Sequence, residues 1–132
     1  MKQYLVDTNI CIFFIKGLYD LKSKFNAVGG ENCMISEITL AELKFGVENS
    51  QHKDKNAKTL ANFLTGIIII PILPSFDIYA KEKARLRKAG QPIDDFDLLI
   101  GATAVANGLI LVTNDHAHLG RIKNIKIEDW TK

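Results

Sequence analysis

Cysteine is scarce in this chain of 132 residues, which contains only Cys11 and Cys33. Both lie in apolar segments and neither belongs to a CxxC pair, so we expect two reduced core thiols and no disulfide. Long apolar runs are absent as well, because no stretch approaches the roughly 20 residues that cross a bilayer. Residues 1–3 lead directly into a strand pattern instead of a signal peptide. We therefore expect a cytoplasmic protein without a membrane segment.

An excess of charge is also missing. The formal net charge of +2 is too small to indicate a nucleic-acid-binding protein by itself. The cations are nevertheless clustered, within 53–58 and within 81–88. Each cluster is either part of a basic rim that binds a phosphate-bearing polymer or an ordinary solvated helix face, and both interpretations stay open.

Short apolar segments alternate with helical patterns along the whole chain. Strands are expected at 4–6, 32–35, 67–70 and 109–112, with a weaker edge strand within 122–127. Helices are expected at about 10–15, 18–25, 36–47, 52–64, 75–89 and 94–107, the fifth of them capped by Ser75. This order predicts an α/β fold, a three-layer sandwich with a mainly parallel central sheet of about five strands. With no linker or repeat, residues 1–132 are expected to form one domain.

Four acids fall where the expected elements meet: Asp7, Glu42, Asp97 and Asp115. Parallel strands share one carboxyl edge, so three of these side chains can converge there, and Asp97 joins them if its helix starts beside that edge. Carboxylates packed together repel one another, and a divalent cation resolves that conflict. Mg²⁺ or Mn²⁺ is the expected ion, because both prefer oxygen ligands.

Each acid also has a simpler structural interpretation. Glu42 follows Thr39, and Asp97 follows Asp94, at the spacing of a capping box. Asp115 can be an ordinary helix cap. A zinc site at His116 and His118 is disfavoured, because no cysteine or further histidine lies near them in sequence.

The first strand is expected to end at Asp7, which makes this acid the hardest to explain as a turn residue. Thr8 and Asn9 follow it, and we expect them to cap the next helix and to hydrogen-bond the Asp7 carboxylate.

Five sequence motifs occur in order along nearly the whole chain. They are 5–9, 35–43 with Gly46 and Val47 after it, 90–93 leading to 97–102, 111–114 and 127–130. Together they resemble the motifs of PIN-domain proteins and, more narrowly, of the VapC toxins of bacterial type II toxin–antitoxin modules. The resemblance implies a Mg²⁺- or Mn²⁺-dependent endoribonuclease that hydrolyses RNA with a metal-activated water. It also implies inhibition by a VapB-type antitoxin, a homodimer, and tRNA as a common substrate of the family.

The resemblance also assigns roles to residues. It implies that Asp7 and Asp97 are metal ligands, with Glu42 as the third carboxylate and Asp115 as the fourth catalytic acid. His118 stands where relatives often have an acid. The implied supporting residues, which would orient carboxylates and water, are Thr8, Asn9, Thr113 and Asn114.

Lys44, Lys83, Arg85 and Arg87 are the candidates for binding RNA phosphates. One alternative keeps the fold without catalysis, as a degenerate PIN domain that serves as a protein-interaction scaffold. A phospho-accepting receiver module is disfavoured, because the strand at 67–70 ends in Pro71 and not in an acceptor aspartate.

Overall fold

Five parallel strands form the centre of the molecule in the computed structural model, which describes residues 2–132. The strand order is β3-β2-β1-β4-β5, and each neighbouring pair is parallel. The strands are β1 (Tyr4–Val6), β2 (Cys33–Ser36), β3 (Ile68–Ile70), β4 (Ile110–Val112) and β5 (Ile127–Glu128). The predicted α/β class and central parallel sheet are therefore confirmed.

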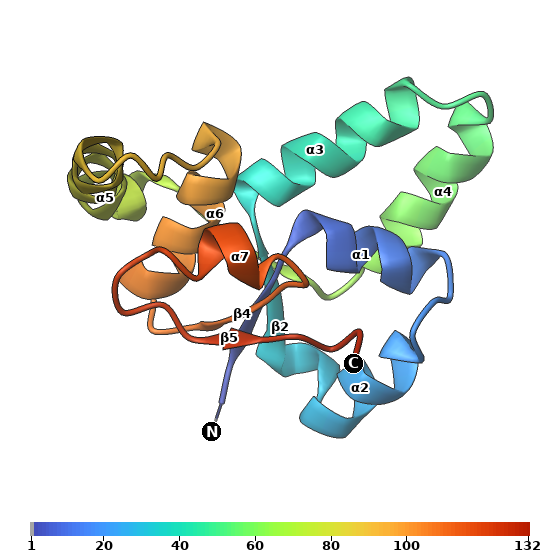
Figure 1. Ribbon diagram of the computed structural model, residues 1–132. Helices are drawn as coiled ribbons and strands as arrows, with labels where there is room; N and C mark the ends of the chain where they lie inside the picture. Colours follow the sequence, from blue (N-terminus) through green and yellow to red (C-terminus); the bar gives the residue numbers. More distant parts are fainter. Residues whose placement is uncertain (1) are drawn as a thin grey trace.

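Helices form the connections between the strands and cover both faces of the sheet (Figure 1). The long ones are α1 (Thr8–Ile15), α2 (Leu21–Val28), α3 (Glu37–Glu48), α4 (Lys53–Leu64), α5 (Phe76–Lys88) and α6 (Asp95–Ala106). Shorter turns are η1 (Gly30–Asn32), η2 (Leu73–Ser75) and α7 (His116–Leu119). One apolar cluster joins the sheet to α1, α2, α3 and α4, and a second joins it to α5, α6 and α7. These two clusters separate the three layers.

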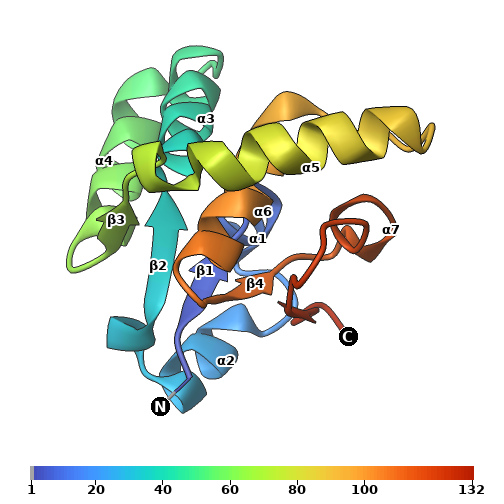
Figure 2. The same ribbon diagram turned by 90° about the vertical axis from the view of Figure 1, so that its left-hand side faces the viewer.

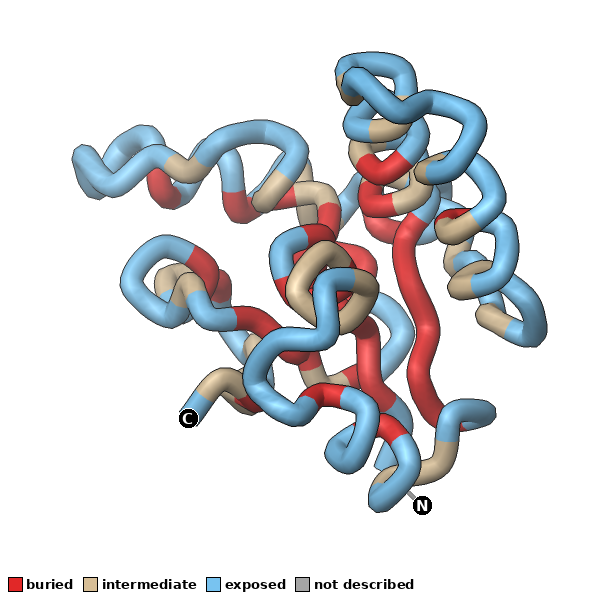
Figure 3. Tube along the Cα trace, turned by 90° about the vertical axis from the view of Figure 1, so that its right-hand side faces the viewer, coloured by how far each residue is buried: buried red, intermediate tan, exposed pale blue. Residues whose placement is uncertain are grey.

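The central strand β1 is buried on both faces, as the apolar run at its centre predicts. Tyr4 and Val6 belong to the first cluster, whereas Leu5, which points to the opposite face, belongs to the second. Strands β1 and β2 are accordingly among the most continuously buried segments of the chain (Figure 3). Asp7, directly after β1, is thus carried by the best-packed part of the molecule.

Strand β3 lies at one edge of the sheet, beside β2 (Figure 2). Ile68 and Ile69 are 50% and 38% exposed there, although their sequence has the strongest β pattern in the chain. At the opposite edge, β5 contains only two residues, so the strand expected within 122–127 starts later than predicted. Asn124 has a φ of +68°, and this left-handed turn delays the start of β5.

One predicted helix start and one predicted side-chain cap were wrong for local reasons. Helix α2 begins at Leu21 and not at 18, because Tyr19 and Asp20 have φ values of +58° and +53°. Ser75 does not cap α5 with its side chain. Its hydroxyl instead donates to the Ile72 carbonyl at 2.6 Å within η2.

The C-terminal segment returns to the core through Trp130, which is 5% exposed. Its ring packs on Tyr4 and Phe25, with centroid distances of 5.2 and 5.5 Å. Cys11 and Cys33 are buried free thiols, as predicted, and burial raises the pKa of Cys33 to about 11. Within residues 2–132, no helix has the length and apolar character of a membrane span.

The burial of Leu5 generates a stability prediction. Leu5→Ala should lower the free energy of unfolding by about 2–5 kcal/mol, because it leaves a cavity under the strand that carries Asp7. Leu18→Ala is the matched control, since Leu18 is 43% exposed and its truncation should cost less than about 1 kcal/mol. Urea unfolding followed by Trp130 fluorescence measures both. Equal losses in the two variants would contradict the assignment of Leu5 to the core.

Candidate active site

The carboxyl edge of the sheet is where the four predicted acids lie. Asp7 follows β1, Glu42 is in α3 after β2, Asp97 is in the first turn of α6, and Asp115 follows β4. The helices α1, α3, α6 and α7 gather above this edge (Figure 1). Segments far apart in sequence therefore bring their acids to one side of the molecule, as the parallel sheet predicts.

Asp7 is only 5% exposed, and both of its carboxylate oxygens accept hydrogen bonds. Oδ1 accepts from the Thr8 backbone N–H, and Oδ2 accepts from the Thr113 hydroxyl, each at 2.8 Å. Thr113 Oγ1 in turn accepts from the Asp115 backbone N–H at 3.0 Å. The side-chain cap of α1 is Asp7 itself, so the prediction that Thr8 and Asn9 cap this helix was wrong. The hydrogen bonds from Thr8 and Thr113, one to each carboxylate oxygen, therefore hold the Asp7 rotamer.

Glu42 accepts a hydrogen bond from the Thr8 hydroxyl at 2.6 Å, which links α3 to the start of α1. The capping interpretation of Glu42 does not hold. The cap of α3 is Ser36, whose hydroxyl oxygen accepts from the Thr39 N–H at 3.1 Å. Glu42 is thus directed toward the residue next to Asp7 instead of toward its own helix terminus.

Asp97 is half-buried and lies in a field of other carboxylates. Its pKa rises from the ordinary 3.8 to about 6, first because of burial and then because of the nearby charges of Asp7, Asp94, Glu42 and Asp115, in that order. Burial also raises the pKa of Asp7, with Glu42 and Asp115 adding to the rise, while the hydrogen bonds from Thr113 and Thr8 oppose it. The acids are therefore electrostatically coupled, which requires that they lie close together.

Asp115 has two roles in the geometry. It caps the short helix α7, because Oδ1 accepts from the His118 backbone N–H at 3.2 Å. The His118 ring lies beside the same carboxylate, with Nδ1 at 2.9 Å from Oδ1 and 3.1 Å from Oδ2. The capping interpretation of Asp115 is thus correct, and its charge also reaches Asp7 and Asp97.

The remaining predicted site residues, the supporting polar residues and the phosphate-binding cations, differ in whether they have partners in the fold. Thr8 and Thr113 hydrogen-bond the acids directly, whereas the Asn9 and Asn114 side chains are exposed and have no hydrogen-bond partner among residues 2–132. Of the four candidate phosphate-binding cations, Lys83 pairs with Asp95 at 2.8 Å and Arg85 pairs with Glu82 at 2.7 Å. Lys44 and Arg87 are exposed and have no carboxylate partner in the described chain.

Three further residues with structural roles were not predicted from the sequence. Asp94, taken only as a helix cap, also adds its charge to the field at Asp97. Glu82 is 7% exposed and accepts from Arg85 and from the Lys123 N–H, which ties α5 to the segment before β5. Thr39 is fully buried, with its hydroxyl 3.0 Å from that of Thr8. None of the three stands out in sequence, because each function depends on a partner in space.

The donor set fits a hard divalent cation. Carboxylate oxygens are the ligands that Mg²⁺ and Mn²⁺ prefer, and within residues 2–132 no lysine or arginine forms an ion pair with Asp7, Glu42 or Asp97. In the same part of the chain, no three His, Cys, Asp or Glu side chains are arranged to hold one ion together. Mg²⁺ typically takes only one or two carboxylates directly and keeps several water ligands, so it does not require three ligating side chains.

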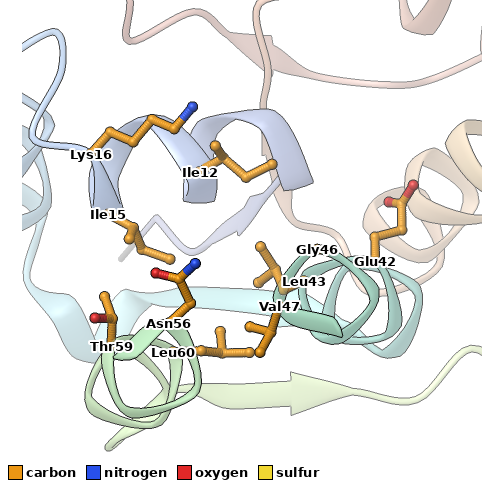
Figure 4. A pocket seen from close by; sticks show the side chains of 10 residues that line it. All are labelled: Ile12, Ile15, Lys16, Glu42, Leu43, Gly46, Val47, Asn56, Thr59 and Leu60. Carbon is orange, nitrogen blue, oxygen red and sulfur yellow. The ribbon is translucent and has the colours of Figure 1, made fainter. Parts of the chain in front are cut away.

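An apolar groove opens beside the acid edge, between α1, α3 and α4 (Figure 4). Its cavity volume is about 270 Å³. The apolar lining comes from Ile12, Ile15, Leu43, Val47 and Leu60. Glu42 lies at one end of the groove, so the groove and the acid edge share a residue.

This architecture matches a known family of proteins. The profile of the PIN domain matches residues 4–124. A crystal structure of VapBC2 from Rickettsia felis bound to a promoter DNA fragment superposes with a TM-score of 0.90 at 34% identity, covering 96% of this chain and 98% of that one. VapBC from Salmonella typhimurium, also bound to DNA, gives 0.90 at 32% identity, covering 98% and 99%. The chain thus belongs to the PIN-domain family.

Sequence comparison narrows this assignment. The tRNA(fMet)-specific endonuclease VapC of Shigella flexneri is 34% identical over 133 residues, covering 99% of this chain and 100% of the relative. Ribonuclease VapC2 of Haemophilus influenzae is 36% identical over 132 residues, covering 98% and 99%. Within the PIN-domain family, the chain is a member of the VapC group.

The raised pKa of Asp97 generates a pH prediction. The folded protein keeps the Asp97 proton up to about pH 6, whereas the unfolded chain releases it near the ordinary 3.8, so ionisation destabilises the fold as pH rises through this window. Asp97→Asn should therefore raise the free energy of unfolding at pH 7, in metal-free buffer, by on the order of 1 kcal/mol, allowing for the half exposure of the group.

Urea titrations at pH 4 and pH 7 measure this effect, and the gain should shrink at the lower pH. Glu48→Gln, an exposed acid near the far end of α3, is the control and should change stability equally little at both values. An equal gain from Asp97→Asn at both pH values would argue against a raised pKa of Asp97 in the folded protein.

Proposed function

We propose that this chain is a divalent-metal-dependent endoribonuclease and the toxin of a type II toxin–antitoxin module, acting as one PIN domain. The observation that supports this most directly is the convergence of Asp7, Glu42, Asp97 and Asp115 at one sheet edge, where the charges of the other three acids add to the effect of burial in raising the pKa of Asp97. Membership of the VapC group supports the RNA substrate, because the relatives are named ribonucleases and endonucleases.

Asp7 and Asp97 would hold the Mg²⁺ or Mn²⁺ ion in this proposal. When bound, such an ion lowers the pKa of a coordinated water and stabilises charge on a phosphate. Glu42 and Asp115 complete the acidic environment and orient water at the phosphodiester. Thr8 and Thr113 hold the carboxylates of Glu42 and Asp7 in place. Asn9 and Asn114 remain predicted supporting residues for the bound state.

RNA would approach the acid edge past the exposed cations. Lys44 is on α3, two residues after Glu42, and Arg87 is on the basic helix α5. Lys83 and Arg85 already neutralise Asp95 and Glu82, so we expect them to contribute less to phosphate binding than Lys44 and Arg87. A tRNA is the first substrate to test, because the Shigella flexneri relative is named a tRNA(fMet)-specific endonuclease.

Neutralising either proposed ligand should abolish most of the activity. Asp7→Asn and Asp97→Asn each replace a carboxylate with an amide of the same shape, and each should lower RNA cleavage by about 100-fold or more. Cleavage of a tRNA pool in Mg²⁺ measures the effect, and isothermal titration calorimetry should show weaker Mg²⁺ binding in both variants. Asp54→Asn, on the exposed start of α4, is the matched control and should leave both values near those of the parent.

Two outcomes would contradict the proposal in different ways. Parent-like cleavage and Mg²⁺ affinity in both variants would show that Asp7 and Asp97 are not the ligands. A parent chain that cleaves no RNA and binds no divalent ion would favour the alternative of a catalytically degenerate scaffold.

A VapB-type antitoxin is the proposed inhibitor, and the apolar groove is its proposed binding site. The structural relatives from Rickettsia felis and Salmonella typhimurium are VapBC complexes, which supports a partner of this class. An apolar helix or strand segment of the antitoxin fits the lining between α1, α3 and α4. Because Glu42 lies at the end of this groove, a bound segment would reach the acid edge and block it.

A homodimer is proposed on a different surface. Large apolar side chains are exposed at β3, η2 and the start of α5 and α6, at Ile68, Ile69, Leu73, Phe76 and Phe96. Such exposure is costly in water and favours burial against a second copy of the chain. Sedimentation of the isolated protein as a monomer at all accessible concentrations would contradict a stable dimer.

The groove assignment generates a binding prediction. Thr59→Arg introduces a long charged side chain into the groove, and it should weaken binding of a VapB-type antitoxin by at least about tenfold. Thr65→Arg, at the C-cap of the same helix and outside the groove, is the control. Pull-down and calorimetry measure the affinities. Unchanged binding by Thr59→Arg would place the antitoxin elsewhere.

A further inference from the structure

Thr39 is a fully buried polar residue whose hydroxyl forms no hydrogen bond within its own helix among the described residues. Its backbone N–H is satisfied by the Ser36 cap, and its hydroxyl has one partner among residues 2–132, the Thr8 hydroxyl at 3.0 Å. Thr8 begins α1, whereas Thr39 lies in the first turn of α3. The contact therefore joins two helices that begin at the acid edge.

The direction of this contact follows from counting protons. The Glu42 carboxylate can only accept, so the single Thr8 hydroxyl proton is used in the 2.6 Å hydrogen bond to Glu42 Oε1. Thr8 Oγ1 must then accept from the Thr39 hydroxyl. The result is a one-way chain from Thr39 to Thr8 to Glu42, in which each hydrogen bond polarises the next.

We infer that Thr39 is a positioning residue of the active site, which holds the Thr8 hydroxyl in the rotamer that donates to Glu42. Fixing Oε1 in this way leaves Glu42 Oε2 as the oxygen available to water or to the ion. The inference rests on the proposed function of Glu42. It assigns a role to Thr39, which touches neither the substrate nor the acids except through Thr8.

The test compares Thr39→Val, which keeps the shape but removes the hydroxyl, with Thr39→Ser, which keeps the hydroxyl. Thr39→Val should weaken Mg²⁺ affinity and lower kcat by about tenfold each, with KM for tRNA unchanged, because the lost contact orients a group near the ion. Thr39→Ser should recover most of both values. In Thr39→Val the Thr8 hydroxyl is no longer held in one rotamer, but Glu42 stays within its reach as an acceptor, so no buried donor is left without a partner and the fold should persist.

Two controls separate positioning from a structural role. Thr103→Val removes another fully buried hydroxyl, which donates to the Leu99 carbonyl at 2.7 Å, and should leave Mg²⁺ affinity unchanged. In a Glu42→Ala background, Thr39→Val should have no further effect on Mg²⁺ affinity, because its action passes through Glu42. Calorimetry of the metal alone measures both.

The outcomes distinguish this inference from the proposed function. Parent-like Mg²⁺ affinity and kcat in Thr39→Val, or an equal loss in the Glu42→Ala background, would overturn the role of Thr39 while leaving the nuclease intact. Dependence of Mg²⁺ affinity on Thr39 in a protein that cleaves no RNA would preserve the role of Thr39 and overturn the nuclease. A parent chain without Mg²⁺ affinity would overturn both.

Discussion

Mutual repulsion among carboxylates at one sheet edge is the constraint on which the rest of this structure depends. Parallel strands deliver Asp7 and Asp115 to the same edge, and α3 and α6 add Glu42 and Asp97. Within residues 2–132, no lysine or arginine forms an ion pair with any of these four acids. Threonine hydroxyls hold the carboxylates instead, which fixes their direction while leaving their charge available to an ion.

Much of the fold could be predicted because its signals are local. The short apolar segments that alternate with helical patterns predicted the strands and their shared edge correctly. Helix starts were harder, because the left-handed backbone at Tyr19 and Asp20 has no marker as clear as glycine. The four acids were found from their positions alone. Thr39 was missed because its partner lies 31 residues away in sequence.

The basic helix α5 shows why charge clusters are ambiguous in sequence. Lys83 and Arg85 were predicted to bind phosphate, yet in the folded chain they form ion pairs with Asp95 and Glu82, respectively. The hydrogen bonds from Arg85 hold the pKa of Glu82 below its usual range, so this pair persists at neutral pH. It also ties α5 to the segment before β5 through Lys123. Part of the basic surface of α5 therefore forms ion pairs within the fold.

Glu42 faces both the acid edge and the apolar groove. Under the proposed function, a mutation of this residue that prevented an inhibitor from covering it would also remove a carboxylate of the active site. The chain would then have little freedom to become resistant to an inhibitor at this point while keeping its nuclease activity. Sequence differences between related toxins would instead be concentrated in the apolar lining of the groove. There, the choice of antitoxin can change without altering the charge at the sheet edge.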